Sequence, residues 1–148
     1  MAVYRFRVKA EGATAPFWRD IEIGADRSLA TLGATIVDAV GVDDHHLWFF
    51  GIGQEYWASP VKYLCHREYA SRSSGGPMWW DEDVFDAAET SVGTLGLDQW
   101  NTLCFVCDYV NDRRFYAILH EITDADGQRS ATLTDGRGRL QFDGTDPQ

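Results

Sequence analysis

The chain has 148 residues, of which 45% are hydrophobic and 14% aromatic, and its formal net charge is -10. The length suits one domain, and the composition excludes a disordered chain. An acidic chain repels phosphate backbones, so nucleic acid is disfavoured as a partner unless the 13 basic residues cluster. No apolar run approaches the roughly 18 residues that span a bilayer, and the first residues lack a signal-peptide core. We therefore expect a soluble protein of the cytoplasm that has no membrane partner.

The choice of charged residues is uneven. Only two of the 13 basic residues are lysines, and aspartate accounts for most of the 23 acidic residues. Such a surface is typical of salt-adapted proteins, in which salt screens the repulsion between like charges. A halophilic source is one explanation of this bias, and a GC-rich genome is the other.

The N-terminal residues predict a β-hairpin. Residues 3–9 alternate between polar and apolar side chains, which is the pattern of a half-buried strand. A turn-forming break follows at residues 11–16, and residues 17–23 then predict a second strand. Because the break is short, the two strands are expected to pair.

An amphipathic helix is predicted directly after the hairpin. Asp26 or Ser28 is a suitable N-cap for a helix that begins near Leu29, and Gly41 is a suitable end. The apolar residues recur at helical spacing. They are Leu29, Leu32, Ile36, Val37 and Val40.

The middle of the chain gives weaker signals. The apolar run at residues 47–52 predicts a third strand, and residues 54–63 predict a neighbouring strand or strand-like arm that Pro60 interrupts. Residues 66–77 contain a Ser- and Gly-rich stretch and predict a mobile loop. Residues 78–88 have no clear period, so we expect an irregular segment or a short helix there.

The last third predicts two further strands and a polar extension. Residues 90–100 resemble a short turn-helix insertion, and residues 101–109 and 115–122 predict strands. We divide the chain into a domain at residues 1–122 and a polar C-terminal extension at residues 123–148. A weak hairpin around Asp135-Gly136 and a frayed end are expected within this extension.

The order of these elements predicts an α+β fold. A hairpin, a helix, a strand, an irregular stretch, a short turn and a central strand follow one another, as in β-grasp domains. We therefore expect a single β-grasp-like domain in which a mixed sheet wraps one main helix. The segment from Thr90 to Cys107 is similar to the final turn and strand of ubiquitin-like folds. A fold analogy of this kind carries no function.

Several motifs in order resemble a known family. A P-x-x-W-R motif stands at Pro16–Arg19 after the first strand, and residues 28–41 match a helix of the type T-L-x-x-L-x-x-x-I-x-x-A-x-G. Residues 41–50 then match a G-W-D-D-x-H-L-x-x-F motif. These motifs resemble the plasmid pRiA4b ORF-3-like family, also met as transposon-passenger TnpR-like proteins.

The resemblance covers residues 3–120 and is looser at its end. Residues 92–97 resemble the family's V-x-L-x-x-L turn, and residues 105–112 resemble its Y-x-Y-D-F-G-D strand pair. Here Val110-Asn111-Asp112 replaces the compact G-D of the family motif. The resemblance implies the fold and an association with mobile elements, and the family has no settled biochemical activity.

The densest polar cluster of the sequence is Asp43, Asp44, His45 and His46. Carboxylates and imidazoles together can bind a divalent metal or act as acid and base. The structural interpretation is that the aspartates satisfy backbone groups of the turn and that His46 packs where the third strand begins. We favour the structural interpretation. A metal site would use Asp44, His46, Asp108 and Asp112, provided that their strands are neighbours.

The three cysteines predict neither a disulfide framework nor a metal site. Cys104 and Cys107 have the C-x-x-C spacing, but residues three apart on a strand point to opposite faces. We therefore expect both to be buried small hydrophobic residues. Cys65 and His66 have no partner that would make them a hydrolase pair.

Exposed aromatic residues are the best hint of a contact surface. Trp18 and Arg19 could offer a stacking ring and an anion contact, although we favour core packing of the tryptophan and solvation of the arginine. Trp57 and Trp79 lie beside segments that we expect to be flexible. The candidate surface comprises Trp18, Arg19, Asp44, His46, Trp48, Trp57 and Trp79.

The sequence thus favours a non-catalytic binding module for an unknown protein or small ligand. A homodimer is one form that such binding could take. We expect no cofactor and no bound metal, and we lean away from an enzyme. The alternative is a small metal-dependent hydrolase that uses the Asp/His cluster.

Overall fold

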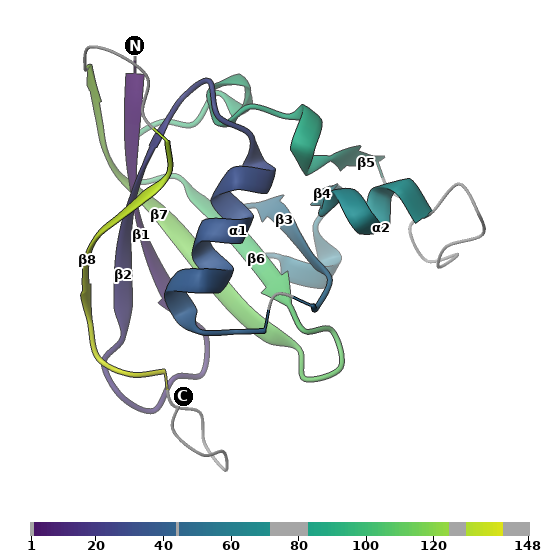
Figure 1. Cartoon of the computed structure of the whole chain (residues 1–148), viewed down its shortest axis with the longest axis horizontal. Coiled ribbons are helices and arrows are strands. Elements are labelled where there is room, and N and C mark those ends of the chain that lie inside the picture. The colour runs from purple at the N-terminus through teal and green to yellow at the C-terminus, as the bar shows by residue number, and fades with distance from the viewer. Residues whose placement is uncertain (1, 44, 72–82, 125–129, 141–148) are drawn as a thin grey trace.

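A computed structural model describes residues 2–43, 45–71, 83–124 and 130–140. Within these ranges the chain forms eight strands and two α-helices (Figure 1). The elements are β1 (Ala2–Ala10), β2 (Trp18–Gly24), α1 (Leu29–Val40), β3 (Trp48–Ile52), β4 (Val61–Leu64), α2 (His66–Ser71), β5 (Asp83–Asp86), β6 (Thr102–Cys107), β7 (Arg113–Asp124) and β8 (Thr132–Arg137). Short 3-10 helices stand at Tyr56–Ala58, Ala87–Glu89 and Val92–Leu95.

The eight strands form one mixed sheet in the order β5-β4-β3-β6-β7-β1-β2-β8. Strands β4 and β5 are parallel, and the other neighbouring strands are antiparallel. Strand β1 pairs with both β2 and β7, so the predicted N-terminal hairpin is confirmed. The fold is therefore a mixture of helix and strand that the sheet dominates.

Helix α1 begins and ends as its sequence predicts. The Ser28 side chain accepts a hydrogen bond from the backbone N–H of Thr31 at 3.1 Å, which caps the helix. Gly41 has a φ of 79°, and this left-handed conformation ends the helix. The buried face of α1 comprises Leu29, Leu32, Gly33, Ile36, Val37 and Val40.

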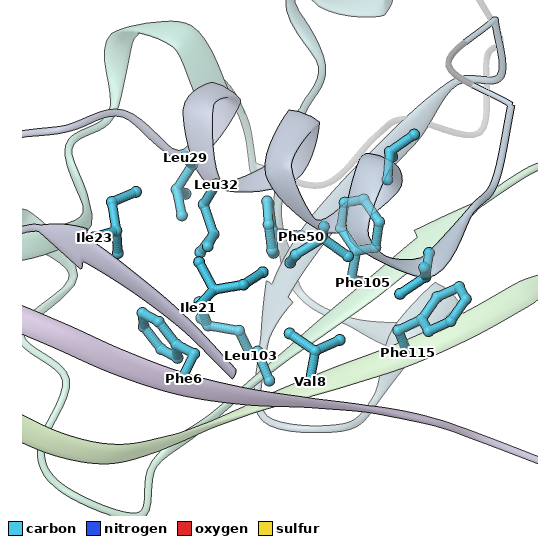
Figure 2. Packing of buried hydrophobic residues seen from close by; sticks show 14 of the residues in the cluster. Phe6, Val8, Ile21, Ile23, Leu29, Leu32, Phe50, Leu103, Phe105 and Phe115 are labelled. Carbon is cyan, nitrogen blue, oxygen red and sulfur yellow. The ribbon is translucent and has the colours of Figure 1, made fainter. Parts of the chain in front are cut away.

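This face of α1 belongs to the main core (Figure 2). Leu29 and Leu32 point from the helix toward Ile21 and Leu103 of the sheet. Tyr4, Phe6 and Val8, which alternate with the polar residues of β1, are buried in the same cluster. The prediction that these two apolar faces meet is confirmed.

A smaller apolar cluster lies on the opposite face of the central strands. Its buried members are Phe49, Tyr56, Leu64, Cys104 and Val106. Trp57 and Tyr109 pack against them, with ring centroids 5.1 Å and 6.0 Å from that of Phe49. Strands β3 and β6 thus have apolar side chains on both faces, which explains why their sequences read as continuous apolar runs.

The structure corrects two predictions in the middle of the chain. Residues 66–71 form α2 rather than part of a loop, and the rest of the predicted loop lies outside the described residues. Residues 83–86 form β5, where we expected an irregular segment or a short helix. The neighbouring strand predicted within 54–63 is confirmed in part, because β4 pairs with β3 and a 3-10 helix precedes it.

Tertiary contacts explain these differences. A helix of six residues is too short to be stable alone. Helix α2 is held by Glu68, which is buried and accepts a hydrogen bond from the Tyr109 hydroxyl at 2.6 Å. Strand β5 forms because β4 provides a parallel edge for it. Neither partner is close in sequence, so no local pattern reveals these elements.

Residues 132–137 form one strand, where we expected a hairpin turn at Asp135-Gly136. Strand β8 pairs with β2, and Asp135 lies opposite Asp20. A Cβ atom at Gly136 would lie 2.8 Å from Cδ of Arg19, so this glycine admits a neighbouring side chain rather than a turn. The division of the chain at residue 122 stays a prediction.

The described part of the chain contains no helix with the length and apolar character needed to cross a membrane.

Candidate functional site

The loop after α1 meets the turn between β6 and β7. Trp48 at the start of β3 pairs with Cys107 at the end of β6, so the residues just outside both strands must also be neighbours. The backbone N–H of Asp108 donates to the carbonyl of Leu47 at 3.2 Å. Beside this bond, Nδ1 of His46 lies 3.6 Å from Oδ1 of Asp108. We call this meeting point, residues 41–43 and 45–47 with residues 108–113, the His46–Asp108 corner.

The turn at the corner is tight, and its aspartates make it so. Asp108 and Asp112 have φ values of 54° and 52°, a left-handed conformation that aspartate tolerates better than most residues. The backbone N–H groups of Asn111 and Asp112 donate to the Asp108 carbonyl at 3.0 Å and 2.8 Å. The Asn111 amide also donates to Oδ2 of Asp108 at 2.6 Å. The backbone bonds hold the turn, and the bond from the Asn111 side chain holds the Asp108 carboxylate.

Three cavities border the corner. The first, about 420 Å³, lies between α1 and the loop and is lined by Ala34, Val37, Asp38, Val42, Asp43 and Trp48. The second, about 180 Å³, is lined by Gly41, Val42, Asp43, His46, Asp108, Arg113 and Leu140. The third, about 320 Å³, is lined by His45, His46, Leu47, Asp108, Tyr109 and Val110. His46 and Asp108 line both of the latter two.

A hydrogen bond within the loop after α1 stabilises the charge of the Asp43 carboxylate. The backbone N–H of His45 donates to Oδ1 of Asp43 at 2.9 Å and lowers the pKa of the Asp43 carboxyl. This bond is the turn-stabilising role that the sequence suggests for an aspartate here. Asp44 lies outside the described residues.

Of the four candidate metal ligands, the structure brings His46 and Asp108 together. Asp112 is engaged differently: Nε1 of Trp57 donates to it at 2.8 Å, and Arg114 binds both of its oxygens at 3.0 Å. Burial favours the neutral form of Asp112, but these hydrogen bonds outweigh burial and lower its pKa. Among the described residues, no group of three or more His, Cys, Asp or Glu side chains is arranged to hold a metal ion.

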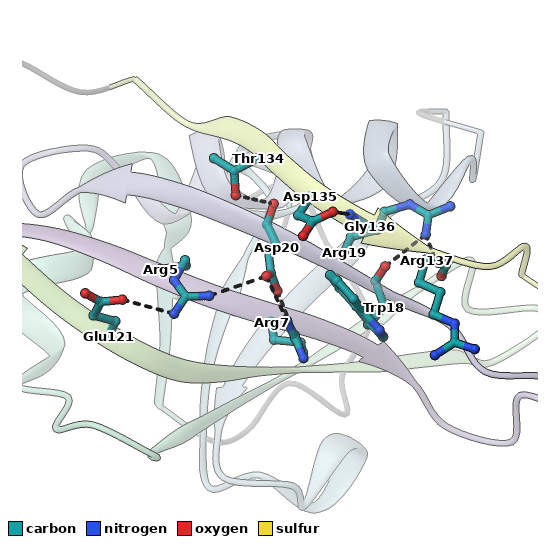
Figure 3. A network of polar contacts seen from close by, with 10 residues as sticks. All are labelled: Arg5, Arg7, Trp18, Arg19, Asp20, Glu121, Thr134, Asp135, Gly136 and Arg137. Carbon is teal, nitrogen blue, oxygen red and sulfur yellow. Dashed lines mark hydrogen bonds and ion pairs between the residues drawn. The ribbon is translucent and has the colours of Figure 1, made fainter.

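Trp18 and Arg19 face opposite sides of the sheet. Trp18 stacks under the Arg7 guanidinium, whose central carbon lies 3.8 Å from the ring centroid. Arg19 instead reaches the end of α1 and the strand β8 (Figure 3). Its guanidinium donates to the backbone carbonyls of Trp18, Ala39, Arg137 and Gly138 at 2.9–3.2 Å. Arg19 therefore links three elements.

The other aromatic residues of the predicted contact surface lie in different parts of the molecule. Trp48 packs on Phe50 and Phe105 and also lines the 420 Å³ cavity. A Cβ atom at Gly33 would lie 2.5 Å from the Trp48 ring, so this glycine lets the helix approach the ring. Trp57 belongs to the smaller apolar cluster, and Trp79 lies outside the described residues.

The sequence did not indicate the positions of three residues: Arg113, Leu140 and Trp100. Arg113 and Leu140 line the 180 Å³ cavity, although they lie far from the loop in sequence. Trp100 is 61% exposed, has a φ of 74° and packs edge-on against His120. A bulky residue with positive φ is rare, and no sequence pattern around Trp100 announces one.

The cysteines lie as predicted, on opposite faces of β6. Cys104 belongs to the smaller cluster and Cys107 to the main core, and both are fully buried. Burial also raises the pKa of the Cys107 thiol to about 12. This leaves almost no thiolate at neutral pH, and the thiolate is the form that reacts and binds metals.

We therefore expect slow thiol modification of the native protein. Ellman's reagent should label Cys104 and Cys107 only after unfolding, and the purified protein should carry no stoichiometric zinc. A Cys104→Ser variant serves as the control for assigning the labelled residue. If the wild type carried stoichiometric zinc and Cys104→Ser lost it, the interpretation of the two cysteines as buried apolar residues would be wrong.

Comparisons with known proteins agree with this architecture. The chain is similar to MM3350, a protein of unknown function from Methanosarcina mazei Go1 whose crystal structure is known, with a TM-score of 0.69 and 16% sequence identity. The similarity covers 95% of this chain and 72% of the other, and at that identity it concerns the fold alone. A search among curated proteins gave no match. The family model described as plasmid pRiA4b ORF-3-like protein matches residues 2–143, and the chain therefore belongs to this family.

Proposed function

We propose that the protein is a non-catalytic binding module whose ligand site is the His46–Asp108 corner. The observation that carries the proposal is the convergence of two cavities on one positioned carboxylate. Asp108 is only 6% exposed, and hydrogen bonds from its own turn fix it. A concave site with a few fixed polar groups is what a binding site requires.

The polar groups of the corner suit recognition of a polar ligand. The walls of the 180 Å³ cavity carry the Asp108 carboxylate, the His46 imidazole and the Arg113 guanidinium. Each of these groups can form a hydrogen bond or an ion pair with a ligand without taking part in a reaction.

One observation favours an enzyme as the second candidate. Nδ1 of His46 lies beside Oδ1 of Asp108, and a carboxylate that orients an imidazole is part of many acid–base sites. A hydrolase of this kind would use Asp44 as a further ligand of a metal ion. His46 and Asp108 are the residues on which both candidates depend.

Small molecular probes can locate the binding site. We expect isopropanol, acetate, methylammonium and imidazole, added one at a time to ¹⁵N-labelled protein, to shift the amide signals of His46, Leu47, Asp108 and Tyr109 most strongly. The reason is that small probes collect where a cavity offers apolar walls and fixed polar groups together. Shifts confined to another surface, for example around Trp100, would contradict the proposed site.

The two candidate functions are separated by turnover. With p-nitrophenyl acetate, and with p-nitrophenyl phosphate plus Zn²⁺ or Mn²⁺, we expect the same rates for the wild type and for His46→Ala. A wild-type rate that exceeds the His46→Ala rate at least about tenfold would favour the hydrolase, since removal of a general base costs about 10²–10⁴-fold. His46→Ala should also lower the free energy of unfolding by about 1–2 kcal/mol, because packing where β3 begins is lost.

The finer interpretation of the fold belongs with this proposal. We infer a single β-grasp-like domain in which the sheet wraps α1. The N-terminal hairpin of β1 and β2, followed by α1 whose buried face packs in the same core as the sheet, supports it. A cytoplasmic location, a mobile-element context, a salt-adapted surface and a homodimer stay predictions from the sequence and the family resemblance.

A further inference from the structure

We propose that the 320 Å³ cavity of the corner binds an alkylammonium or alkylguanidinium group, with the Asp108 carboxylate as its counter-ion. The inference rests on the proposed binding function and adds the chemical class of the ligand. It follows from three properties of the cavity: the position of one carboxylate, the partners of that carboxylate, and the apolar walls around it.

Asp108 is one of the residues that line the cavity. It is nearly buried, and burying an ionised carboxylate is unfavourable unless a cation or several strong hydrogen bonds compensate. Oδ2 accepts the short bond from the Asn111 amide, whereas Oδ1 has longer contacts: 3.4 Å to the Asn111 backbone nitrogen and 3.6 Å to His46. In the described part of the chain, no lysine or arginine nitrogen lies within 4.0 Å of this carboxylate. A ligand cation would add an ion pair to these hydrogen bonds.

The neighbouring charges favour this one cavity over the other. Arg113 lines the 180 Å³ cavity and would repel a second cation there. Among the described residues, the lining of the 320 Å³ cavity includes no lysine or arginine, and its ionisable side chains besides Asp108 are two histidines and Tyr109. The Tyr109 hydroxyl donates to Glu68, and burial followed by that carboxylate raises the pKa of Tyr109, so the ring stays neutral. Asp108 therefore provides the dominant charge of the cavity.

The apolar walls of the cavity would contact an alkyl stem next to the charged group of the ligand. Leu47, Tyr109 and Val110 line the cavity, and the exposed Val110 offers an apolar side chain to a ligand. The volume is at the lower end of the range for ligand pockets, about 300–1,000 Å³, so the cavity suits one short side chain or a small amine. A cation with a short alkyl stem matches both the carboxylate and these walls.

Four probes with systematic differences test the inference. Titrations of ¹⁵N-labelled protein with n-butylammonium, butyrate, 1-butanol and ammonium chloride separate the contributions of charge and stem. We expect n-butylammonium to bind at the corner at least about tenfold more tightly than butyrate or butanol, because a charge-assisted hydrogen bond to Asp108 distinguishes it. Ammonium should bind more weakly than n-butylammonium because it lacks the stem.

Two variants and one control then assign the contacts. Asp108→Asn keeps the shape and the tolerance of positive φ, and it should weaken n-butylammonium binding about tenfold. Asp98→Asn removes the same charge from an exposed residue outside the corner and should leave the affinity nearly unchanged. Val110→Ser alters an exposed wall residue and should reduce the advantage of n-butylammonium over ammonium.

The source of the cation is distinguished by a further titration. A blocked Gly-Lys-Gly peptide that binds more tightly than n-butylammonium would indicate a protein side chain, and weaker binding would indicate a free amine. Equal affinity for all four small probes at the corner would overturn this inference and leave the proposed function standing. Preference for butyrate would likewise overturn it. No probe binding at the corner would contradict both proposals.

Discussion

Replacement of Leu32 by alanine is expected to lower the free energy of unfolding by about 2–5 kcal/mol, the largest effect that we predict for a single apolar side chain. Leu32 is fully buried on α1 and points into the main core toward the sheet (Figure 2). The alanine would leave a cavity that the surrounding side chains cannot close, because protein cores are densely packed. A urea titration followed by tryptophan fluorescence measures the change.

The matched control is Leu133→Ala. Leu133 is 48% exposed on the edge strand β8, so the same truncation removes little buried surface and should change the stability by less than about 0.5 kcal/mol. If Leu32→Ala cost less than about 1 kcal/mol, α1 would not contribute to the core as the structure indicates.

The second large effect concerns Asp20, whose ion pairs are expected to stabilise the face of the sheet that lies opposite α1. Asp20 is 3% exposed, and it receives two hydrogen bonds from Arg7, at 2.8 Å and 3.0 Å, and a longer one of 3.4 Å from Arg5 (Figure 3). Arg7 and Asp20 are also direct cross-strand partners of β1 and β2. Asp20→Asn should therefore lower the free energy of unfolding by about 2–3 kcal/mol, because it removes charge-assisted bonds and leaves the Arg7 guanidinium without its hydrogen-bonded carboxylate.

Glu121→Gln provides the comparison for this experiment. Glu121 pairs with the same Arg5 at 3.0 Å, but its side chain is 50% exposed, and exposed ion pairs contribute only about 0–1 kcal/mol. The two isosteric changes thus differ mainly in burial. Equal losses in the two variants, measured by chemical unfolding at the same ionic strength, would show that the burial of Asp20 does not strengthen its pairs.

The proposals and the predicted fold depend on different parts of the molecule. Leu32 and Asp20 report on the two faces of the sheet, whereas Asp108 and His46 report on its end. A variant of the corner that alters probe binding without a loss of stability comparable to that of Leu32→Ala would therefore assign the corner to function rather than to folding. Asp108→Asn is the informative variant because asparagine conserves both the volume and the turn geometry.

The elements that the sequence determined are those with a complete local signal. Strict alternation identified β1, a serine cap and a left-handed glycine delimited α1, and an apolar run identified β6. The opposite placement of Cys104 and Cys107 followed from strand geometry alone. In each case the information lies within a dozen consecutive residues, so no knowledge of distant contacts is needed.

Only the tertiary structure decided the remaining features, because their stabilising partners are distant in sequence. Helix α2 depends on the bond from Tyr109 to Glu68, and β8 forms on the edge of β2 despite its turn-like Asp-Gly pair. His46 meets Asp108 because the antiparallel pairing of β3 and β6 brings the start of one strand to the end of the other. Cavities form where such loops meet, and a loop sequence does not specify its neighbour. The candidate residues could therefore be named from the sequence, but their grouping at one corner came from the pairing of strands.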